Sequence, residues 1–264
     1  MISDYIEESY TELEARVHDM ESDMDALVSD YLANFYVDDT FIKNTSNNYS
    51  LANKSNEVFD DAFNAFIIGF LLFLAKKITN GTILTVSDFS AKGIKPVGDE
   101  VAKVGKMIGY VDGKIVKGGY LSELGKMGIL RLKFHNYIIK GVSTGQKLNL
   151  FLKGARPMFR SFGEDESDFA AFYRRYAYDS VAQTMNTIAL YIADERGLTH
   201  FLYEGGLVKD SRPFCRTQAG GTFTRDDAKK FDAMDWKGKI PDVPFLIAAG
   251  GYNCQHFINW IPNK

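Results

Sequence analysis

The sequence is poor in cysteine and histidine, since its 264 residues contain two cysteines and four histidines. Two cysteines are too few for a small secreted domain that is held together by disulfide bonds. The opening residues, Ile2-Ser3-Asp4-Tyr5, show neither the basic nor the apolar segment of a secretory signal. We therefore expect a protein that is made and kept in a reducing cytoplasm.

Phosphate-binding loops and bilayer-length apolar runs are also missing. Neither G-x-x-x-x-G-K-[ST] nor a strand-to-helix G-x-G-x-x-G occurs, which argues against the common nucleotide-binding sites. The main apolar run, residues 62–75, has fourteen residues, fewer than the roughly twenty that span a bilayer. We expect this run to be the buried part of a helix over residues 57–78. We expect no stable membrane span.

Net charge is small, at −3, so no overall field draws the chain to nucleic acid. The distribution is uneven: residues 1–40 hold twelve acidic residues and one basic residue, whereas residues 76–160 hold about three times as many basic as acidic residues. The basic residues either contact DNA phosphates or form a solvated face. We expect an acidic helical arm (1–40), a helical, glycine-rich, basic body (51–165) and a C-terminal region (166–264).

An apolar stripe runs through the first 35 residues. Its members alternate four and three residues apart, with no proline or glycine between them: Ile6, Tyr10, Leu13, Val17, Met20, Met24, Leu27 and Tyr31. This heptad spacing predicts one long helix over residues 3–35. Acidic residues flank the stripe, so a parallel copy of the helix would meet like charge. The stripe either packs on the core of its own chain or binds a partner with a basic surface.

The glycine-rich middle permits two descriptions. Residues 43–50 are polar and predict a loop. Residues 82–86 suit a short strand, and residues 110–116 contain the Asp-Gly pair of a β-hairpin. Alternatively, the glycines separate short helices.

The C-terminal region predicts a long helix followed by a small α+β unit. The helix covers residues 168–196, with Ser167 as its N-cap. Short strands are expected near 199–204 and 222–224, and Thr224 is placed to cap a further helix. The whole chain is therefore expected to be α+β and predominantly helical.

Each of the two cysteines lies in an unusual segment: Cys215 in residues 209–216 and Cys254 in residues 250–257. Cys215, Cys254 and His256 offer thiolate and imidazole groups, the usual ligands of structural zinc. Their spacing, a lone cysteine and a Cys-x-His, lacks the two close pairs of a typical zinc site. Free buried thiols, a disulfide and a metal site all stay open.

A structural role is the alternative to catalysis in these segments. The planar guanidinium of an arginine can bridge backbone carbonyls or a carboxylate, so we predict a structural knot. The knot consists of Arg212, Cys215, Asn253, Cys254 and His256. We predict no catalytic residue, because the sequence shows no base beside Cys215 or Ser211.

These segments, together with residues 201–206, Gly221-Thr222-Phe223 and Trp236, resemble the C-terminal domain of phage head morphogenesis proteins. These are minor capsid proteins similar to protein F of phage Mu and to the minor head protein of phage SPP1. The family closes on Asn-Cys-Arg-Cys or Asn-Cys-Arg-His, and here Gln255 stands at the position of the arginine. The resemblance covers about residues 170–262.

The resemblance implies a virion structural protein, a minor head protein that acts in head morphogenesis at the portal or the capsid interior. It would be assembled in the host cytoplasm, as a homo-oligomer or in multiple copies per virion. Its partners would be the portal protein, the major capsid protein or both, and it would have a possible role in DNA packaging or ejection. It implies binding without catalysis and, zinc aside, no cofactor. A nucleic-acid-binding virion protein and a toxin-like enzyme of unknown reaction stay open as alternatives.

Overall fold

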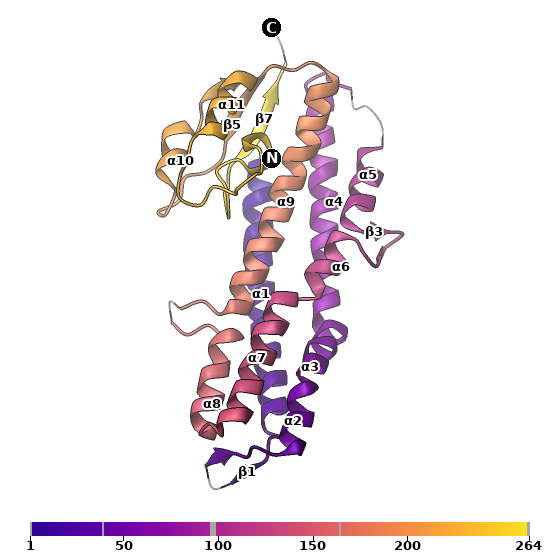
Figure 1. The fold of residues 1–264 in the computed structure, drawn as a ribbon. Coiled ribbons are helices and arrows are strands. Elements are labelled where there is room, and N and C mark those ends of the chain that lie inside the picture. Colours follow the sequence, from indigo (N-terminus) through magenta and orange to yellow (C-terminus); the bar gives the residue numbers. More distant parts are fainter. Residues whose placement is uncertain (1, 39, 96–98, 164, 263–264) are drawn as a thin grey trace. The chain divides into compact units, whose positions relative to one another are not determined.

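The structure, a computed structural model, describes residues 2–38, 40–95, 99–163 and 165–262 (Figure 1). It is 65% helical, with a long N-terminal helix, a helical body and a small three-stranded antiparallel sheet with helices near the C-terminus. The predicted class, α+β and predominantly helical, is thereby confirmed.

The chain divides into two compact units, each assembled from separate stretches of sequence. The sheet unit comprises residues 1–13, 73–114 and 175–264, and the helical unit comprises residues 14–72 and 115–174. Three long helices contribute residues to both units: α1 (Ile2–Leu32), α4 (Ile68–Ala91) and α9 (Asp168–Glu195).

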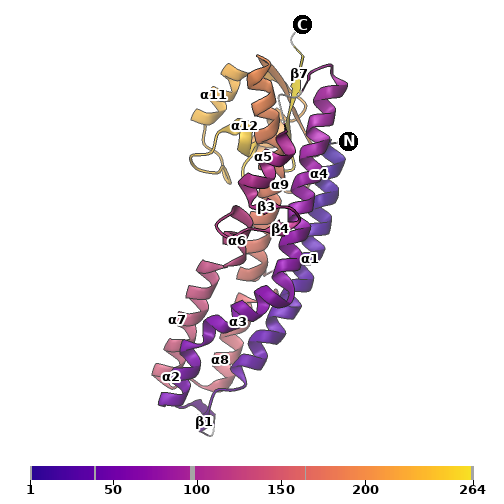
Figure 2. The same ribbon diagram turned by 90° about the vertical axis from the view of Figure 1, so that its right-hand side faces the viewer.

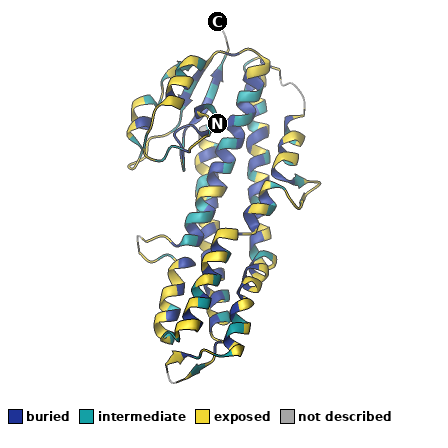
Figure 3. Cartoon of the chain, in the orientation of Figure 1, coloured by how far each residue is buried: buried dark blue, intermediate teal, exposed yellow. Residues whose placement is uncertain are grey.

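Helix α1 confirms the long helix expected from the heptad spacing. Five residues of the apolar stripe are buried and three are half-buried, and Figure 3 shows buried residues along the helix. The half-buried ones are Tyr10, Leu27 and Tyr31. Packing within the chain therefore accounts for the stripe. None of its eight side chains is fully exposed and so available for the predicted binding of a partner.

The helical unit contains α2 (Ser46–Asn53), α3 (Ser55–Ala62), a π-helical turn (Phe63–Ile67), α6 (Tyr120–Gly125), α7 (Gly128–Thr144), α8 (Leu148–Ala155) and a short 3-10 turn (Arg156–Met158). Two short strands, β1 (Val37–Asp38) and β2 (Phe41–Ile42), pair antiparallel. Aromatic rings form its core, where Phe134 packs edge-on against Phe159 at 5.1 Å and Phe59 at 5.9 Å.

The loop predicted at residues 43–50 is wrong, because α2 begins at Ser46. The hydroxyl of Thr45 accepts the N–H of Asn48 and caps the helix. Asn48 is buried and hydrogen-bonds the backbone of Tyr36 and Lys43. Tertiary contacts of one polar side chain thus stabilise a helix that has no apolar periodicity.

The strand suggested at residues 82–86 is also wrong, since α4 continues to Ala91. The hydroxyls of Thr82 and Thr85 donate to the carbonyls of Ile78 and Gly81, so these β-branched residues are satisfied within the helix. A Cβ on Gly81 would lie 2.8 Å from Sδ of Met185 on α9. This glycine therefore marks a close helix contact within the sheet unit.

The apolar run of residues 62–75 belongs to a longer helical stretch, Ser46–Ala91. By length and composition alone, this stretch could cross a membrane, and 44% of its most apolar window is buried inside the structure. Core helices of soluble proteins meet the same criterion. The absence of a membrane span accordingly stays a prediction.

The sheet has the strand order β6-β5-β7 and is antiparallel. Its strands are β5 (His200–Glu204), β6 (Thr222–Thr224) and β7 (Phe257–Ile261). Phe201 in the central strand pairs with Phe223 on one side and Trp260 on the other. The strands expected near 199–204 and 222–224 are confirmed.

Three short helices accompany the sheet: α10 (Pro213–Gln218), α11 (Arg225–Ala233) and α12 (Phe245–Ala248) (Figures 1 and 2). Thr224 and Asp227 form a capping box at the start of α11, as the sequence predicted for Thr224. At the start of α9, the hydroxyl of Ser167 accepts the N–H of Ala170, which confirms the second predicted cap.

The predicted hairpin around Asp112-Gly113 is present. Its strands are β3 (Tyr110–Val111) and β4 (Lys114–Ile115), which follow α5 (Glu100–Ile108) in the chain (Figure 2). Asp112 and Gly113 both have positive φ, as a tight two-residue hairpin turn requires. The middle of the chain therefore combines short helices with a hairpin.

Candidate functional site

The candidate site lies where two loops meet the central strand of the sheet unit. After β5, the chain runs through residues 205–212 and enters α10 at Pro213, which suits the first turn of a helix. This helix carries Cys215. Residues 249–256 then carry Cys254 and His256 back to the start of β7.

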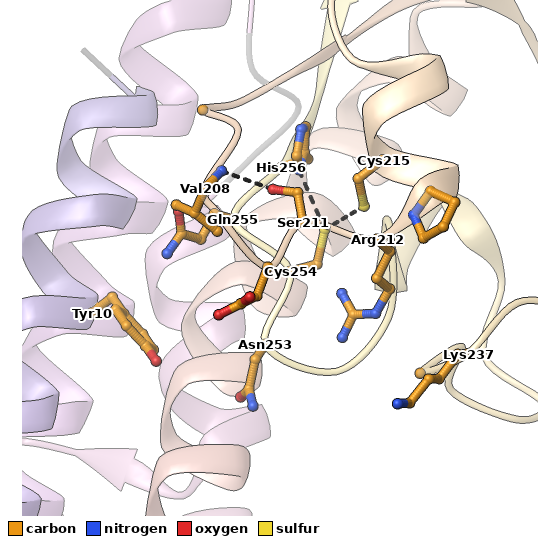
Figure 4. A pocket seen from close by; sticks show the side chains of 14 residues that line it. Tyr10, Val208, Ser211, Arg212, Cys215, Lys237, Asn253, Cys254, Gln255 and His256 are labelled. Atoms are coloured by element: carbon orange, nitrogen blue, oxygen red, sulfur yellow. Dashed lines mark hydrogen bonds between the residues drawn. The ribbon is translucent and has the colours of Figure 1, made fainter. Parts of the chain in front are cut away.

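Cys215, Cys254 and His256 form one buried cluster (Figure 4). The Sγ atoms of the cysteines are 4.0 Å apart, and Sγ of Cys254 is 3.6 Å from Nδ1 of His256. Their exposed fractions are 2%, 5% and 2%, and both thiols are free. Within the described residues, these three form the one group of cysteine, histidine and acidic side chains that could hold a metal ion.

Tyr203 completes the cluster and was missed from the sequence. Its hydroxyl is 3.4 Å from Sγ of Cys215 and 3.5 Å from Sγ of Cys254, and its ring stacks on His256 at 4.7 Å. Burial strongly raises the pKa of Tyr203, so the phenol stays protonated. The alternation of β5 puts Phe201 and Tyr203 on one face and so indicates that Tyr203 is buried, but it does not indicate the contact with the sulfurs.

The two thiols influence each other. Hydrogen bonds lower the pKa of Cys215 although burial opposes this change. The bond with Cys254 has the largest effect, and those with His256 and Tyr203 have smaller effects. The same contact with Cys215, together with burial, raises the pKa of Cys254. The two sulfurs therefore titrate as a coupled pair, in which Cys215 loses its proton more readily than Cys254.

Glycine allows the backbone to approach this cluster closely. The N–H of Gly250 donates to Sγ of Cys254 at 3.2 Å. A Cβ on Gly250 would lie 2.5 Å from Sγ of Cys215 and 2.6 Å from Sγ of Cys254. Trp236 fixes the same residue from the other direction, since its indole N–H donates to the Gly250 carbonyl at 2.9 Å.

Arg212 and Asn253 tie the two loops and α9 together. The guanidinium of Arg212 donates to the carbonyl of Tyr252. Asn253 has positive φ, which asparagine tolerates better than most residues, and its N–H donates to Oδ1 of Asp179 at 2.8 Å. Also on α9, the hydroxyl of Tyr178 donates to the Cys254 carbonyl at 3.0 Å.

A pocket of about 530 Å³ opens beside the cluster. Cys215, Cys254 and His256 belong to its lining, and the positively charged Arg212 and Lys237 line it as well (Figure 4). The arrangement can thus offer soft ligands to a metal ion and cationic side chains to an anion.

Asp179 gives the site a testable pH dependence. Burial raises the pKa of its carboxyl from 3.8 to about 6, although the Asn253 N–H and nearby arginines oppose the change. Between pH 3.8 and about pH 6, the carboxyl of Asp179 is protonated in the folded chain and ionised in the unfolded chain. The free energy of unfolding therefore falls as the pH rises through this range. The protonated carboxyl contributes about 3 kcal/mol to the stability at low pH, and this contribution is lost by about pH 7.

The variant Asp179→Asn keeps an oxygen acceptor for the Asn253 N–H and buries no charge. We expect its free energy of unfolding, relative to wild type, to increase by up to about 3 kcal/mol between about pH 4 and pH 7. Urea denaturation at several pH values measures this. Asp235→Asn, at an exposed position, is the control, and parallel pH profiles for Asp179→Asn and wild type would contradict the prediction.

The five residues predicted as a structural knot, Arg212, Cys215, Asn253, Cys254 and His256, all lie in these two loops and α10. Gln255, which replaces the arginine of the resembling family, lines the pocket. Comparisons with protein-family models, with curated proteins and with solved structures found no match to this chain.

Proposed function

We propose that this chain is a structural protein of a phage virion, a minor head protein that acts in head morphogenesis at the portal or the capsid interior. The observation that carries the proposal is the resemblance of residues 170–262 to phage head morphogenesis proteins. Three of the motif residues behind that resemblance, Cys215 and the more distant Cys254 and His256, lie together in the sheet unit.

The contacts of these residues favour a structural role over catalysis. Arg212 binds a backbone carbonyl of the second loop, and Asn253 and Cys254 are held by Asp179 and Tyr178 of α9. Each of these bonds joins a side chain of one segment to a backbone group of another segment. They hold the two loops and α9 together, which suits a protein that acts by binding.

Ion pairs within the chain account for part of the uneven charge distribution. In the helical unit, Asp25 of α1 pairs with Arg156 and Arg160 of the basic body. In the sheet unit, Glu12 pairs with Lys77. Glu12 and Lys77 neutralise each other, and Asp25 offsets one of the two arginine charges beside it. To that extent the pairs weaken the alternative that the basic body binds DNA.

Exposed acidic side chains of α1 in the helical unit offer a contact surface for a basic partner. They are Asp19, Asp23 and Asp30. Exposed charges of this kind steer association and are screened by salt. We propose that the portal protein of the same phage provides the basic surface.

Neutralising this surface should weaken portal binding. In the triple variant Asp19→Asn, Asp23→Asn and Asp30→Asn, we expect co-sedimentation with purified portal rings to fall several-fold at low salt and the difference to shrink at high salt.

The control removes the same number of exposed acidic charges elsewhere, through Asp61→Asn, Asp226→Asn and Asp235→Asn. It should bind like wild type. Equal portal binding by the two triple variants would remove the acidic surface from the proposal.

A further inference from the structure

We propose that Cys215, Cys254 and His256 bind a zinc ion through their two sulfur atoms and Nδ1 of the imidazole. The proposal rests on the geometry of the cluster and is independent of the proposed virion function. Its ligands come from α10 and from the loop before β7, so the ion would join α10 to that loop.

The separations of the three ligand atoms suit a tetrahedral zinc site. Zinc–sulfur bonds of about 2.3 Å and zinc–nitrogen bonds of about 2.0 Å place tetrahedral ligand atoms roughly 3.5–3.8 Å apart. The observed distances are 4.0 Å between the sulfurs and 3.6 Å from Cys254 to His256, and all three atoms lie within 4.8 Å of one another. Side-chain movements of about an ångström or less close the group on an ion.

A disulfide and a pair of ordinary buried thiols both fit the cluster less well than a metal site does. A disulfide requires sulfur atoms at about 2.05 Å, whereas these are 4.0 Å apart and free. Ordinary buried thiols leave Nδ1 of His256 with only a weak contact to a sulfur at 3.6 Å. Burying a poorly satisfied polar atom costs free energy, which coordination of Nδ1 to a metal would offset.

The surroundings support thiolate ligands. Sγ of Cys254 accepts the N–H of Gly250 at 3.2 Å, and the hydroxyl of Tyr203 is within 3.5 Å of both sulfurs. Donors of this kind hold metal-bound thiolates in place.

Three protein ligands leave the fourth position around a tetrahedral zinc ion open, and we assign this position to a water molecule. The pocket beside the cluster is lined by all three ligands and provides room for that water and a path for the ion. On binding, the ion replaces the thiol protons, which pass to solvent, so no oxidant or reductant is required.

Cobalt(II) substitution tests the proposal directly. The reduced, full-length chain is freed of metal by a chelator and titrated with cobalt(II). We expect sulfur-to-cobalt charge-transfer absorption and strong visible bands of tetrahedral cobalt, both saturating at one ion per chain and abolished by added zinc. Absence of the charge-transfer absorption would overturn the proposal.

Ligand variants locate the ion. Cys215→Ser and Cys254→Ser should lose most of the charge-transfer absorption, and His256→Asn should lose tight binding. His200→Asn is the control, since His200 is exposed in the same unit. Cobalt spectra that are unchanged in both cysteine variants would place any bound ion elsewhere and overturn the proposal.

Two further measurements do not depend on ligand variants that fold. In the wild-type chain, urea at a concentration that makes both thiols of the metal-free chain react with a maleimide should leave them protected when zinc is present. Equal, measurable alkylation with and without zinc would count against the site. Tyr203→Phe should weaken zinc affinity about 10- to 100-fold, as expected for loss of an outer contact. Tyr5→Phe, which removes a hydrogen bond to Lys77 elsewhere in the sheet unit, should leave the affinity unchanged.

Discussion

Replacing Gly250 by alanine is expected to lower the free energy of unfolding by about 3 kcal/mol, the upper range for overpacking a core. The added methyl group would lie 2.5 and 2.6 Å from the two cysteine sulfurs and 2.8 Å from the hydroxyl of Tyr203. Cys215, Cys254 and Tyr203 are buried, so they have little room to move. The backbone must retreat instead, and the hydrogen bond from Gly250 to Cys254 is lost.

Gly206→Ala is the matched control for this substitution. A Cβ on Gly206 meets no atom within 4 Å, and the residue lies in the first loop of the same site. We expect a change within about 0.5 kcal/mol. Urea denaturation of both variants measures the difference, and similar stabilities for Gly250→Ala and Gly206→Ala would show that the cluster is loosely packed.

The second large effect is expected from Asn48→Ala in the helical unit, with a loss of about 3 kcal/mol. The side chain is fully buried and accepts the Tyr36 N–H at 2.8 Å, while its amide donates to the carbonyls of Tyr36 and Lys43, each at 2.8 Å. Alanine removes all three bonds and leaves the Tyr36 N–H without this partner, while the carbonyls of Tyr36 and Lys43 keep their bonds from the N–H groups of Lys43 and Thr45.

Its control is the neighbouring Asn47→Ala, because Asn47 is exposed in the same helix. Alanine favours helix more than asparagine does, so this variant should be as stable as wild type or slightly more stable. If denaturation midpoints of the Asn47 and Asn48 variants coincide, the backbone bonds of Asn48 do not stabilise the fold as described.

Patterns that depend on local spacing were predicted well from the sequence. The heptad stripe predicts α1, because each side chain of a long helix returns to one face every three or four residues. The caps at Ser167 and Thr224 were likewise visible, since an N-cap needs a short polar side chain at one defined position.

Features that depend on distant residues could not be predicted in this way. Helix α2 depends on the contacts of Asn48 with Tyr36 and Lys43, which no periodicity reveals. Thr82 and Thr85 are typical of strands, yet their hydroxyls are satisfied inside α4. Sequence preference is a weak guide wherever tertiary contacts supply such bonds.

The candidate site was predicted in part. Cys215, Cys254 and His256 stood out by residue type, but their distances depend on how two loops meet β5. Tyr203 resembled an ordinary core residue, and its contact with both sulfurs could be found only in the structure. The close approach at Gly250 was likewise hidden in a Gly-Gly pair.

Mass spectrometry of gradient-purified phage particles, after carbodiimide cross-linking of carboxylates to lysines, tests the proposed virion function most directly. We predict that the chain is present in the particles and that exposed acids of α1, such as Asp19, Asp23 and Asp30, are joined to lysines of the portal protein. Absence of the chain from purified particles would contradict the proposed function.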